Sequence, residues 1–187
     1  MIMTFKQAFQ LYRHAQKGVS AVEFALIVPL ILLIYFACVE LSLLMVLDRK
    51  VTTSTSTLGD LTARAMTISN SELDDIFEAT RMIFQPNDMS DARMRVSSLY
   101  NNGGTVQVRW SESCNTTAYS ANQVVTAPAN LVPEGGSIIL AEIEYDYNSA
   151  LGYFFATTKT LSDQFYLRPR RVGEVTREQE DGFTCAL

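Results

Sequence analysis

Residues 24–47 read FALIVPLILLIYFACVELSLLMVL, a stretch in which Glu40 is the only charged residue. At about 1.5 Å per residue, a helix over this stretch reaches roughly 36 Å, enough to cross a hydrocarbon core of about 30 Å. A spanning helix tolerates Pro29, because neighbouring helices or local adjustments satisfy the freed carbonyl. The sequence therefore predicts a transmembrane helix over residues 19–47.

The apolar stretch is too long for a secretory signal peptide, whose apolar region spans about 7 to 15 residues and precedes a small-x-small cleavage site. Residues 48–51 instead read DRKV.

The first 18 residues contain Lys6, Arg13 and Lys17 and no acidic residue. These cations predict that the amino terminus stays in the cytoplasm and that the carboxyl-terminal part crosses the membrane.

Beyond residue 18 the chain is acidic. The chain has 15 Lys and Arg against 20 Asp and Glu, a net charge of -5. Because three cations precede residue 19, the rest carries 12 cations against 20 acids, or -8. An acidic body repels phosphate backbones, so we expect no nucleic-acid partner.

Just before the apolar stretch, residues 17–24 read KGVSAVEF, which resembles the cleavage site of a prepilin peptidase. Gly18 has no side chain, so a protease can approach the backbone closely there. A cut after Gly18 would expose the α-ammonium group of Val19, which is mostly protonated at neutral pH because its pKa is about 7.7 to 8.0. Glu23 lies one helical turn further on. In apolar surroundings the two charges should attract, within a subunit or between stacked subunits. Alternatively, Glu23 marks the water interface of an ordinary anchor.

This segment resembles the TadE-like minor pilins, or pseudopilins, of tight-adherence (Flp) pili. The basic residue and glycine, Glu23-Phe24 at the fifth and sixth positions after the cut, the apolar stretch around Pro29 and the later Glu40 carry the resemblance over about residues 16–48. The chain departs from the family's usual Glu-Phe-Gly ending, because Leu41 and Ser42 follow Glu40.

The resemblance implies a structural role in building or initiating a pilus. It implies cleavage between Gly18 and Val19 by a prepilin peptidase, and pairing of the new terminus with Glu23. The implied partners are that peptidase, other minor pilins, the major Flp pilin, the inner-membrane assembly platform and the membrane itself. Small side chains at Ser20 and Ala21 would let neighbouring helices approach closely.

Glu40 allows two interpretations. It lies 17 residues beyond Glu23, about 26 Å along a helix, so it can reach the outer membrane interface. Alternatively, as a carboxylate within an apolar segment, it pairs with another subunit.

The remaining chain predicts an α+β fold, with a leader at 1–18, the membrane helix at 19–47, a helical region at 48–90 and a sheet-rich domain at 91–187. The first helix continues with a soft junction at the Thr/Ser-rich residues 52–57. Its apolar positions are Val51, Leu58, Leu61, Ala65 and Ile68. A second helix is capped by Ser71, with Asp74 at the third position after the cap, and is stopped by Pro86. Its apolar face comprises Leu73, Ile76, Phe77, Thr80 and Phe84.

Alternating patterns predict an antiparallel sheet packed against the helices. The predicted strands are 95–100 and 105–110, joined by a hairpin turn at 101–104, then 137–147 and 165–170. On the third strand, Ile139, Ala141, Ile143, Tyr145 and Tyr147 form one face. Glu142, Glu144 and Asp146 form the other, which we expect to be solvated rather than a cation site. Residues 112–136 are expected to be loop with one short strand.

Of the three cysteines, Cys38 lies in the apolar stretch, where it acts as a small hydrophobe. Cys114 and Cys185 lie in the part placed outside the cytoplasm, where a disulfide is permitted. Spacing alone does not establish the geometry, so their pairing stays open.

The sequence argues against catalysis. The only histidine, His14, lies in the leader, and no Walker or dinucleotide motif is present. We therefore expect no enzyme activity, metal or other cofactor. The rival hypothesis to a minor pilin is a binding or sensing module with an uncleaved anchor.

Overall fold

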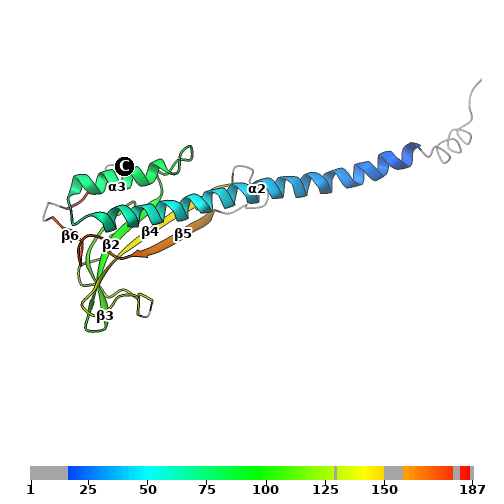
Figure 1. Ribbon diagram of the computed structural model, residues 1–187. Coiled ribbons are helices and arrows are strands. Elements are labelled where there is room, and N and C mark those ends of the chain that lie inside the picture. Colours follow the sequence, from blue (N-terminus) through cyan, green and yellow to red (C-terminus); the bar gives the residue numbers. More distant parts are fainter. Residues whose placement is uncertain (1–16, 129, 150–157, 179–181, 186–187) are drawn as a thin grey trace, which may run out of the picture. The chain divides into compact units, whose positions relative to one another are not determined.

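The computed structural model describes residues 17–128, 130–149, 158–178 and 182–185. The leader predicted for residues 1–18 therefore lies largely outside the described residues, as does His14. The chain divides into two compact units, Met1–Leu43 and Leu44–Leu187. Figure 1 shows a long amino-terminal helix followed by a small domain with an antiparallel sheet and a further helix, which confirms the predicted α+β class.

Helix α2 (Lys17–Arg64) is unbroken over 48 residues, through Pro29 and through the Thr/Ser-rich residues 52–57. The soft junction expected there is therefore not a break in the helix. Hydroxyl groups in this stretch donate to the helix's own carbonyls; for example, Thr55 Oγ1 donates to Val51 O at 2.8 Å and Thr57 Oγ1 to Thr53 O at 2.8 Å. These bonds satisfy the side chains within the helix, so they do not disrupt it.

Helix α2 ends at Arg64, so only some of the apolar positions predicted for it lie within the helix. Val51 and Leu58 are buried, as predicted, whereas Ala65 and Ile68 lie beyond the last turn. Ile68 belongs to β1 (Thr67–Ile68), a two-residue strand that pairs in parallel with β6 (Thr176–Arg177).

Helix α3 (Asn70–Met82) is capped by Ser69, so the predicted cap at Ser71 is wrong. Ser69 Oγ accepts a hydrogen bond from the Glu72 backbone at 3.3 Å, while the Ser69 backbone donates to Glu72 Oε2 at 2.9 Å. The reciprocal arrangement needs a glutamate three positions after the cap, which Ser69 has and Ser71 lacks. Leu73, Phe77 and Thr80 are buried as predicted.

Four antiparallel strands form the main sheet in the order β3-β2-β4-β5. They are β2 (Arg93–Asn102), β3 (Thr105–Cys114), β4 (Ser137–Tyr147) and β5 (Lys159–Leu167). The predicted hairpin is present, with Asn102 opposite Thr105 and positive φ angles of 61° at Gly103 and 90° at Gly104. Such angles suit glycine and match the twist of the two strands.

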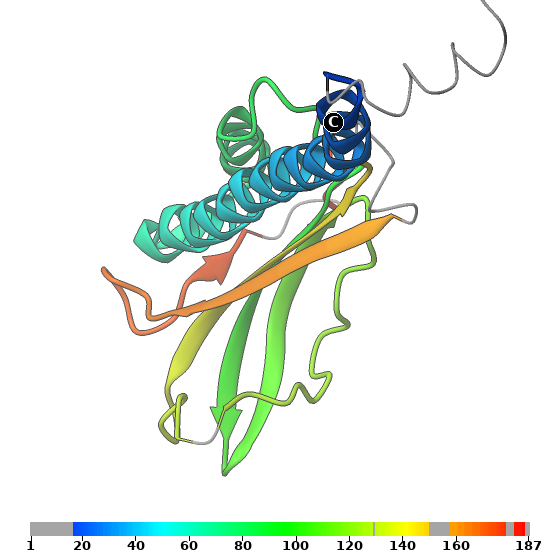
Figure 2. The same cartoon turned by 90° about the vertical axis from the view of Figure 1, so that its right-hand side faces the viewer.

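The carboxyl-terminal strand is displaced from its prediction. The structure places β5 at Lys159–Leu167, whereas residues 165–170 were expected. The first part of β5 is polar because the strand lies at the edge of the sheet (Figure 2), so its sequence lacks the apolar alternation used for prediction. In the segment 112–136, β3 extends to Cys114 and a single bridge joins Gln107 to Val124.

The main core lies on one side of this sheet. The part of α2 from Leu44 onward and α3 lie on the same side of the sheet in Figures 1 and 2. They bury Leu47, Val51, Leu58, Leu73 and Phe77 together with Val96, Ile139, Ala141 and Ile143 of the strands. The interior face predicted for β4 is therefore buried, with Tyr145 only partly so.

A second, smaller core lies on the opposite side of the sheet. It contains Leu99, Val108, Val132, Ile138 and Leu140. Side chains of β2 alternate between the two faces of the sheet, so Val96 joins the main core and Leu99, three positions further on, joins the second one. The beginning of β4 is consequently buried on both faces, and its run of Ile138, Ile139 and Leu140 reflects this.

The end of the described chain is joined to the sheet by a disulfide between Cys114 and Cys185, whose Cα atoms are 5.4 Å apart. Next to it, Phe183 stacks on Phe77 of α3 with ring centroids 5.7 Å apart. Cys38 is a free cysteine on the exposed surface of α2.

Gly59 lies at a close approach between α2 and the sheet. A Cβ atom at this position would overlap Leu167 Cδ1 and lie 3.2 Å from Ala141 Cβ. We predict that Gly59→Leu lowers the free energy of unfolding by about 1 to 3 kcal/mol, because the helix must move away from the strands. Denaturant titration of the full chain in detergent, followed by the fluorescence of its single tryptophan, measures this.

Thr53→Leu is the matched control, because Thr53 is exposed on the same helix. Its effect should stay within about 0.5 kcal/mol. Equal effects of the two substitutions would contradict a close contact at Gly59.

Candidate functional site

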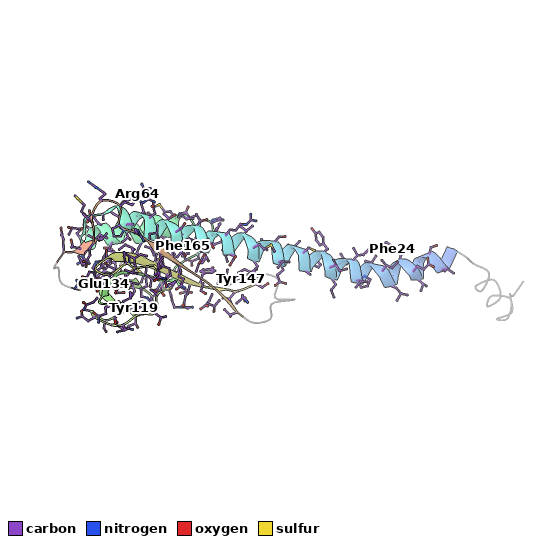
Figure 3. The ribbon with its side chains drawn as sticks, turned by 60° about the horizontal axis from the view of Figure 1, so that its bottom comes forward. Phe24, Arg64, Tyr119, Glu134, Tyr147 and Phe165 are labelled. Atoms are coloured by element: carbon purple, nitrogen blue, oxygen red, sulfur yellow. A yellow bond between two sulfur atoms is a disulfide. The ribbon has the colours of Figure 1, made fainter. Side chains whose placement is uncertain are left out.

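The first unit presents apolar side chains on every side of α2, as Figure 3 shows for the part of the helix around Phe24. The exposed apolar residues include Val19, Val22, Phe24, Leu26, Ile27, Leu30, Ile31, Leu32, Leu33 and Ile34. Within the described ranges, one helix is long and apolar enough to cross a membrane by length and composition. A helix that is apolar all round needs lipid or other apolar helices around it, so α2 fits a membrane anchor.

Gly18 lies in the first turn of α2 and is exposed. A Cβ atom added to it would meet nothing within 4 Å. Packing within the described chain therefore gives no reason for glycine at this position. A requirement for glycine here would have to come from a molecule that approaches the backbone from outside, or from the ease with which the first turn unwinds.

Val19 and Glu23 lie one helical turn apart, on the same side of α2. Their axial separation is about 6 Å by the standard helical rise. Both side chains are exposed, and no ion pair to Glu23 is present among the described residues. The neighbouring Phe24 is 70% exposed. In the intact chain the Val19 nitrogen is an uncharged peptide nitrogen, and a cut after Gly18 would convert it to an ammonium group one helical turn from Glu23.

Pro29 and Glu40 differ in their surroundings. Pro29 is exposed, and because it has no N–H group it leaves the carbonyl of Ala25 without its usual helical donor. Glu40 is buried, with 1% of its surface exposed, and it takes part in an interaction. Whether Glu40 serves the membrane interface or another subunit stays a prediction.

In the second unit, two arginines of β2 lie opposite the acidic residues of β4. Arg95 Nε donates to Glu142 Oε2 at 2.8 Å, and Arg93 donates to Glu144 at 3.0 Å and to Asp146 at 2.7 Å. The cross-strand register causes this, since Arg95 pairs with Glu142 and Arg93 with Glu144.

The fully solvated acidic face predicted for β4 is therefore wrong at Glu142, whose side chain is only 19% exposed. Tyr119 covers this region, with its ring centroid 3.8 Å from Arg95 Cζ. Its hydroxyl accepts from Arg95 at 2.7 Å and donates to Glu142 Oε1 at 3.2 Å. Sequence reasoning missed both arginines, although Arg93-x-Arg95 alternates with the same period as Glu142-x-Glu144.

Two other chemical possibilities find no support in the described part of the chain. No group of three or more His, Cys, Asp and Glu residues among the described residues is arranged to hold a metal ion. Asn115 begins an Asn-Thr-Thr sequence, which fits the pattern of an N-glycosylation site. Its side-chain amide is already engaged, because it donates to Ala92 O at 3.0 Å and to Ser90 O at 2.5 Å.

Hydrogen bonds from Arg93 and then from Thr160 lower the pKa of Asp146 to about 2, from an ordinary value of 3.8. Because the folded-state pKa is depressed, the resulting stabilisation is complete above about pH 4 and is lost as the pH falls toward 2. We predict that Arg93→Gln raises the pKa of Asp146 toward 3.8, as measured by carboxyl carbon NMR titration. Arg168→Gln, at an exposed arginine without an ion pair among the described residues, should leave it unchanged. An unaltered Asp146 pKa in Arg93→Gln would contradict this assignment.

Comparison with known proteins finds one family model that matches part of α2. The family model described as TadE-like protein matches residues 18–57, which begin at Gly18 and include Glu23, Pro29 and Glu40. No curated protein and no solved structure matches this chain. Residues 18–57 of this protein therefore form a TadE-like segment.

Proposed function

We propose that this protein is a minor pilin or pseudopilin of a tight-adherence (Flp) pilus, with a structural rather than a catalytic role. The observation that carries the proposal is the sequence KGVSAVEF at the start of a helix that is apolar on all sides, within the TadE-like segment. In this proposal the precursor is anchored in the inner membrane by α2, and residues 44–187 lie in the periplasm.

Processing begins with a prepilin peptidase that cuts between Gly18 and Val19. A peptidase must open the backbone at the cut. Glycine lowers the cost, since it is about 1 kcal/mol less favourable than alanine in a helix. The exposure of Gly18, where a Cβ atom would meet nothing within 4 Å, supports access of a peptidase to this backbone.

After the cut, the α-ammonium group of Val19 and the carboxylate of Glu23 are paired. Each charge is costly in an apolar environment unless it has a partner. Within one chain the two groups are a helical turn apart. In a bundle, the ammonium of one subunit binds the Glu23 of its neighbour and thereby sets the axial register between the helices. The other subunits are related minor pilins and the major pilin, delivered by the inner-membrane assembly platform.

The proposed orientation has support at both ends of the chain. Lys6, Arg13 and Lys17 precede the apolar stretch and favour a cytoplasmic amino terminus. The disulfide between Cys114 and Cys185 lies in the second unit. Disulfides persist in oxidising compartments such as the periplasm and are rare in the cytosol.

We predict that co-expression with the cognate prepilin peptidase removes the first 18 residues and leaves Val19 as the amino terminus. Gly18→Ala should slow or block the cut, because the added methyl group hinders approach of the protease and favours the helix. Intact-mass measurement and amino-terminal sequencing detect both results. Gly173→Ala is the control, since a Cβ atom there also meets nothing within 4 Å, and it should be cut normally. An uncut native chain in its own cell would refute the proposal.

We also predict that Glu23→Gln is cut normally but is lost from assembled pili, because the new ammonium group then has no carboxylate partner. Immunoblots of sheared surface fibres and of membranes separate assembly from processing. Asp75→Asn removes one exposed carboxylate of α3 and should be incorporated like the wild type. Normal incorporation of Glu23→Gln would show that the proposed charge pairing is not needed.

The second candidate function is a membrane-tethered binding or sensing module that retains its first 18 residues. One feature favours it, namely a polar hollow on the sheet that is lined by Glu142, Glu144, Ser162, Asp163 and Gln164. The mass of the protein isolated from its own membrane distinguishes the two candidates, because only the minor pilin loses its leader.

A further inference from the structure

Two contacts show which part of α2 lies beside the end of β4. Lys50 Nζ donates to Phe84 O at 3.0 Å. The ring of Phe84 in turn lies beside the ring of Tyr145 on β4, with centroids 5.7 Å apart. The last turn of β4 residues before its end at Tyr147 is therefore close to Lys50.

A contact further along gives the relative direction of the two elements. A Cβ atom at Gly59 would lie 3.2 Å from Ala141 Cβ. The strand covers about 13 Å from Ala141 to Tyr145, and the helix covers about 14 Å from Gly59 back to Lys50. Because the two lengths agree, β4 and this part of α2 run side by side in opposite directions.

The end of the sheet is level with the first residues of the second unit. Tyr147 lies about 7 Å beyond the contact of Tyr145, which places it level with Met45 and Val46 of α2. Figure 3 shows Tyr147 at the end of the domain remote from Arg64. The beginning of β5 lies at the same level, because Tyr147 is paired with the first residue of that strand.

The surface of α2 changes from apolar to polar at this level. Met45 and Val46 are 55% and 56% exposed and continue the apolar surface of the preceding turns. The next exposed positions, Asp48 and Arg49, are charged. On the other side of the same turns, Leu47 packs into the main core. A bilayer that covers the exposed side of α2 as far as Val46 therefore reaches the end of the sheet.

The charge at this end of the sheet suits phospholipid headgroups. Lys159, the partner of Tyr147, is exposed and has no ion pair among the described residues. Asp146, one position before the end of β4, is paired with Arg93. The adjacent charges at positions 48 and 49 offset each other. A lysine at the membrane interface can lay its flexible stem along apolar surface and extend its ammonium group to a phosphate.

We propose that the end of the sheet formed by Asn148, Thr158 and Lys159 binds phospholipid headgroups on the membrane surface from which α2 emerges, with the ammonium group of Lys159 on a headgroup phosphate. Thr158 Oγ1 donates to Asn148 Oδ1 at 2.9 Å, which joins the two strands at this end. The contact holds the domain against the membrane instead of leaving it free to tilt on its anchor. The inference rests on α2 as a membrane anchor, which both candidate functions share, and not on cleavage after Gly18.

The test uses the full chain with Cys38→Ala in vesicles of phosphatidylethanolamine and phosphatidylglycerol, to which a lipid with nickel chelated on its headgroup is added. A nitroxide is attached at Thr160→Cys, beside the proposed contact, or at Thr105→Cys in the hairpin. Nickel shortens the relaxation time of a nearby nitroxide, which electron paramagnetic resonance measures. Only the label at position 160 should be relaxed, because the two positions lie about 35 Å apart along the strands.

Lys159→Gln removes the proposed phosphate ligand. The ratio of docked to undocked copies should fall about fivefold, the usual effect of one basic residue near an anionic membrane, and the relaxation at position 160 should fall with it. High salt should act in the same direction. Arg168→Gln is the matched control, since it removes an exposed cation just beyond the other end of β5, and it should leave the relaxation unchanged. Circular dichroism establishes that each variant is folded.

An anchored chain whose label at position 160 relaxes no more than the label at position 105 overturns the docking. Unchanged relaxation in Lys159→Gln, or relaxation that increases with salt, also overturns it. Extraction with alkaline carbonate checks the anchor separately. A chain released by carbonate contradicts both candidate functions together with this inference, whereas an anchored chain without docking contradicts this inference alone.

Discussion

The exposed apolar surface of α2 before Leu44 is the constraint on which the rest of this protein depends. Water cannot accommodate side chains such as Phe24 and Leu26 on every side of a helix, so this part of α2 requires lipid or other apolar helices. The same surroundings make any charge costly. Glu23 is therefore costly without a partner, and in the proposed function the ammonium group of Val19 is that partner.

The same helix meets a different environment after Leu44. There, Val51 and Leu58 pack into the main core, Gly59 allows close contact with β4 and β5, and the outward positions are polar. Threonine and serine are weak helix formers. Their hydroxyl groups are nevertheless satisfied by carbonyls of the preceding turn, and packing on the sheet supplies the stability that local propensity lacks.

The domain uses charge differently on its two faces. The helix-covered face is apolar, whereas part of the opposite face holds the ion pairs of Arg93 and Arg95. Several of these groups are partly exposed, so each pair adds little stability. Their larger effect is to fix the positions of the carboxylates that line the hollow on β4 and β5. The disulfide holds the carboxyl-terminal segment on the other side, against α3 through Phe183.

Patterns that extend over many residues were predictable. The apolar stretch, the hairpin with its two glycines, and β4 with its exact bounds all follow from period, length and turn chemistry. The predictions of the helix cap and of the last strand were less accurate, because neighbouring residues or an edge position allowed alternatives. Two serines could cap α3, and the longer Glu72 side chain selected Ser69. On β5, edge position allowed polar residues that carry no strand pattern.

The sequence by itself determined that one helix is apolar enough to span a membrane, and it predicts a processing site from the order of Gly18, Val19 and Glu23. These properties depend only on residues close together in the chain. The tertiary structure alone decided that Cys114 meets Cys185 and that Arg95 neutralises Glu142. Such contacts join residues that are distant along the chain, and strand register, which local sequence does not specify, brings them together or holds them apart.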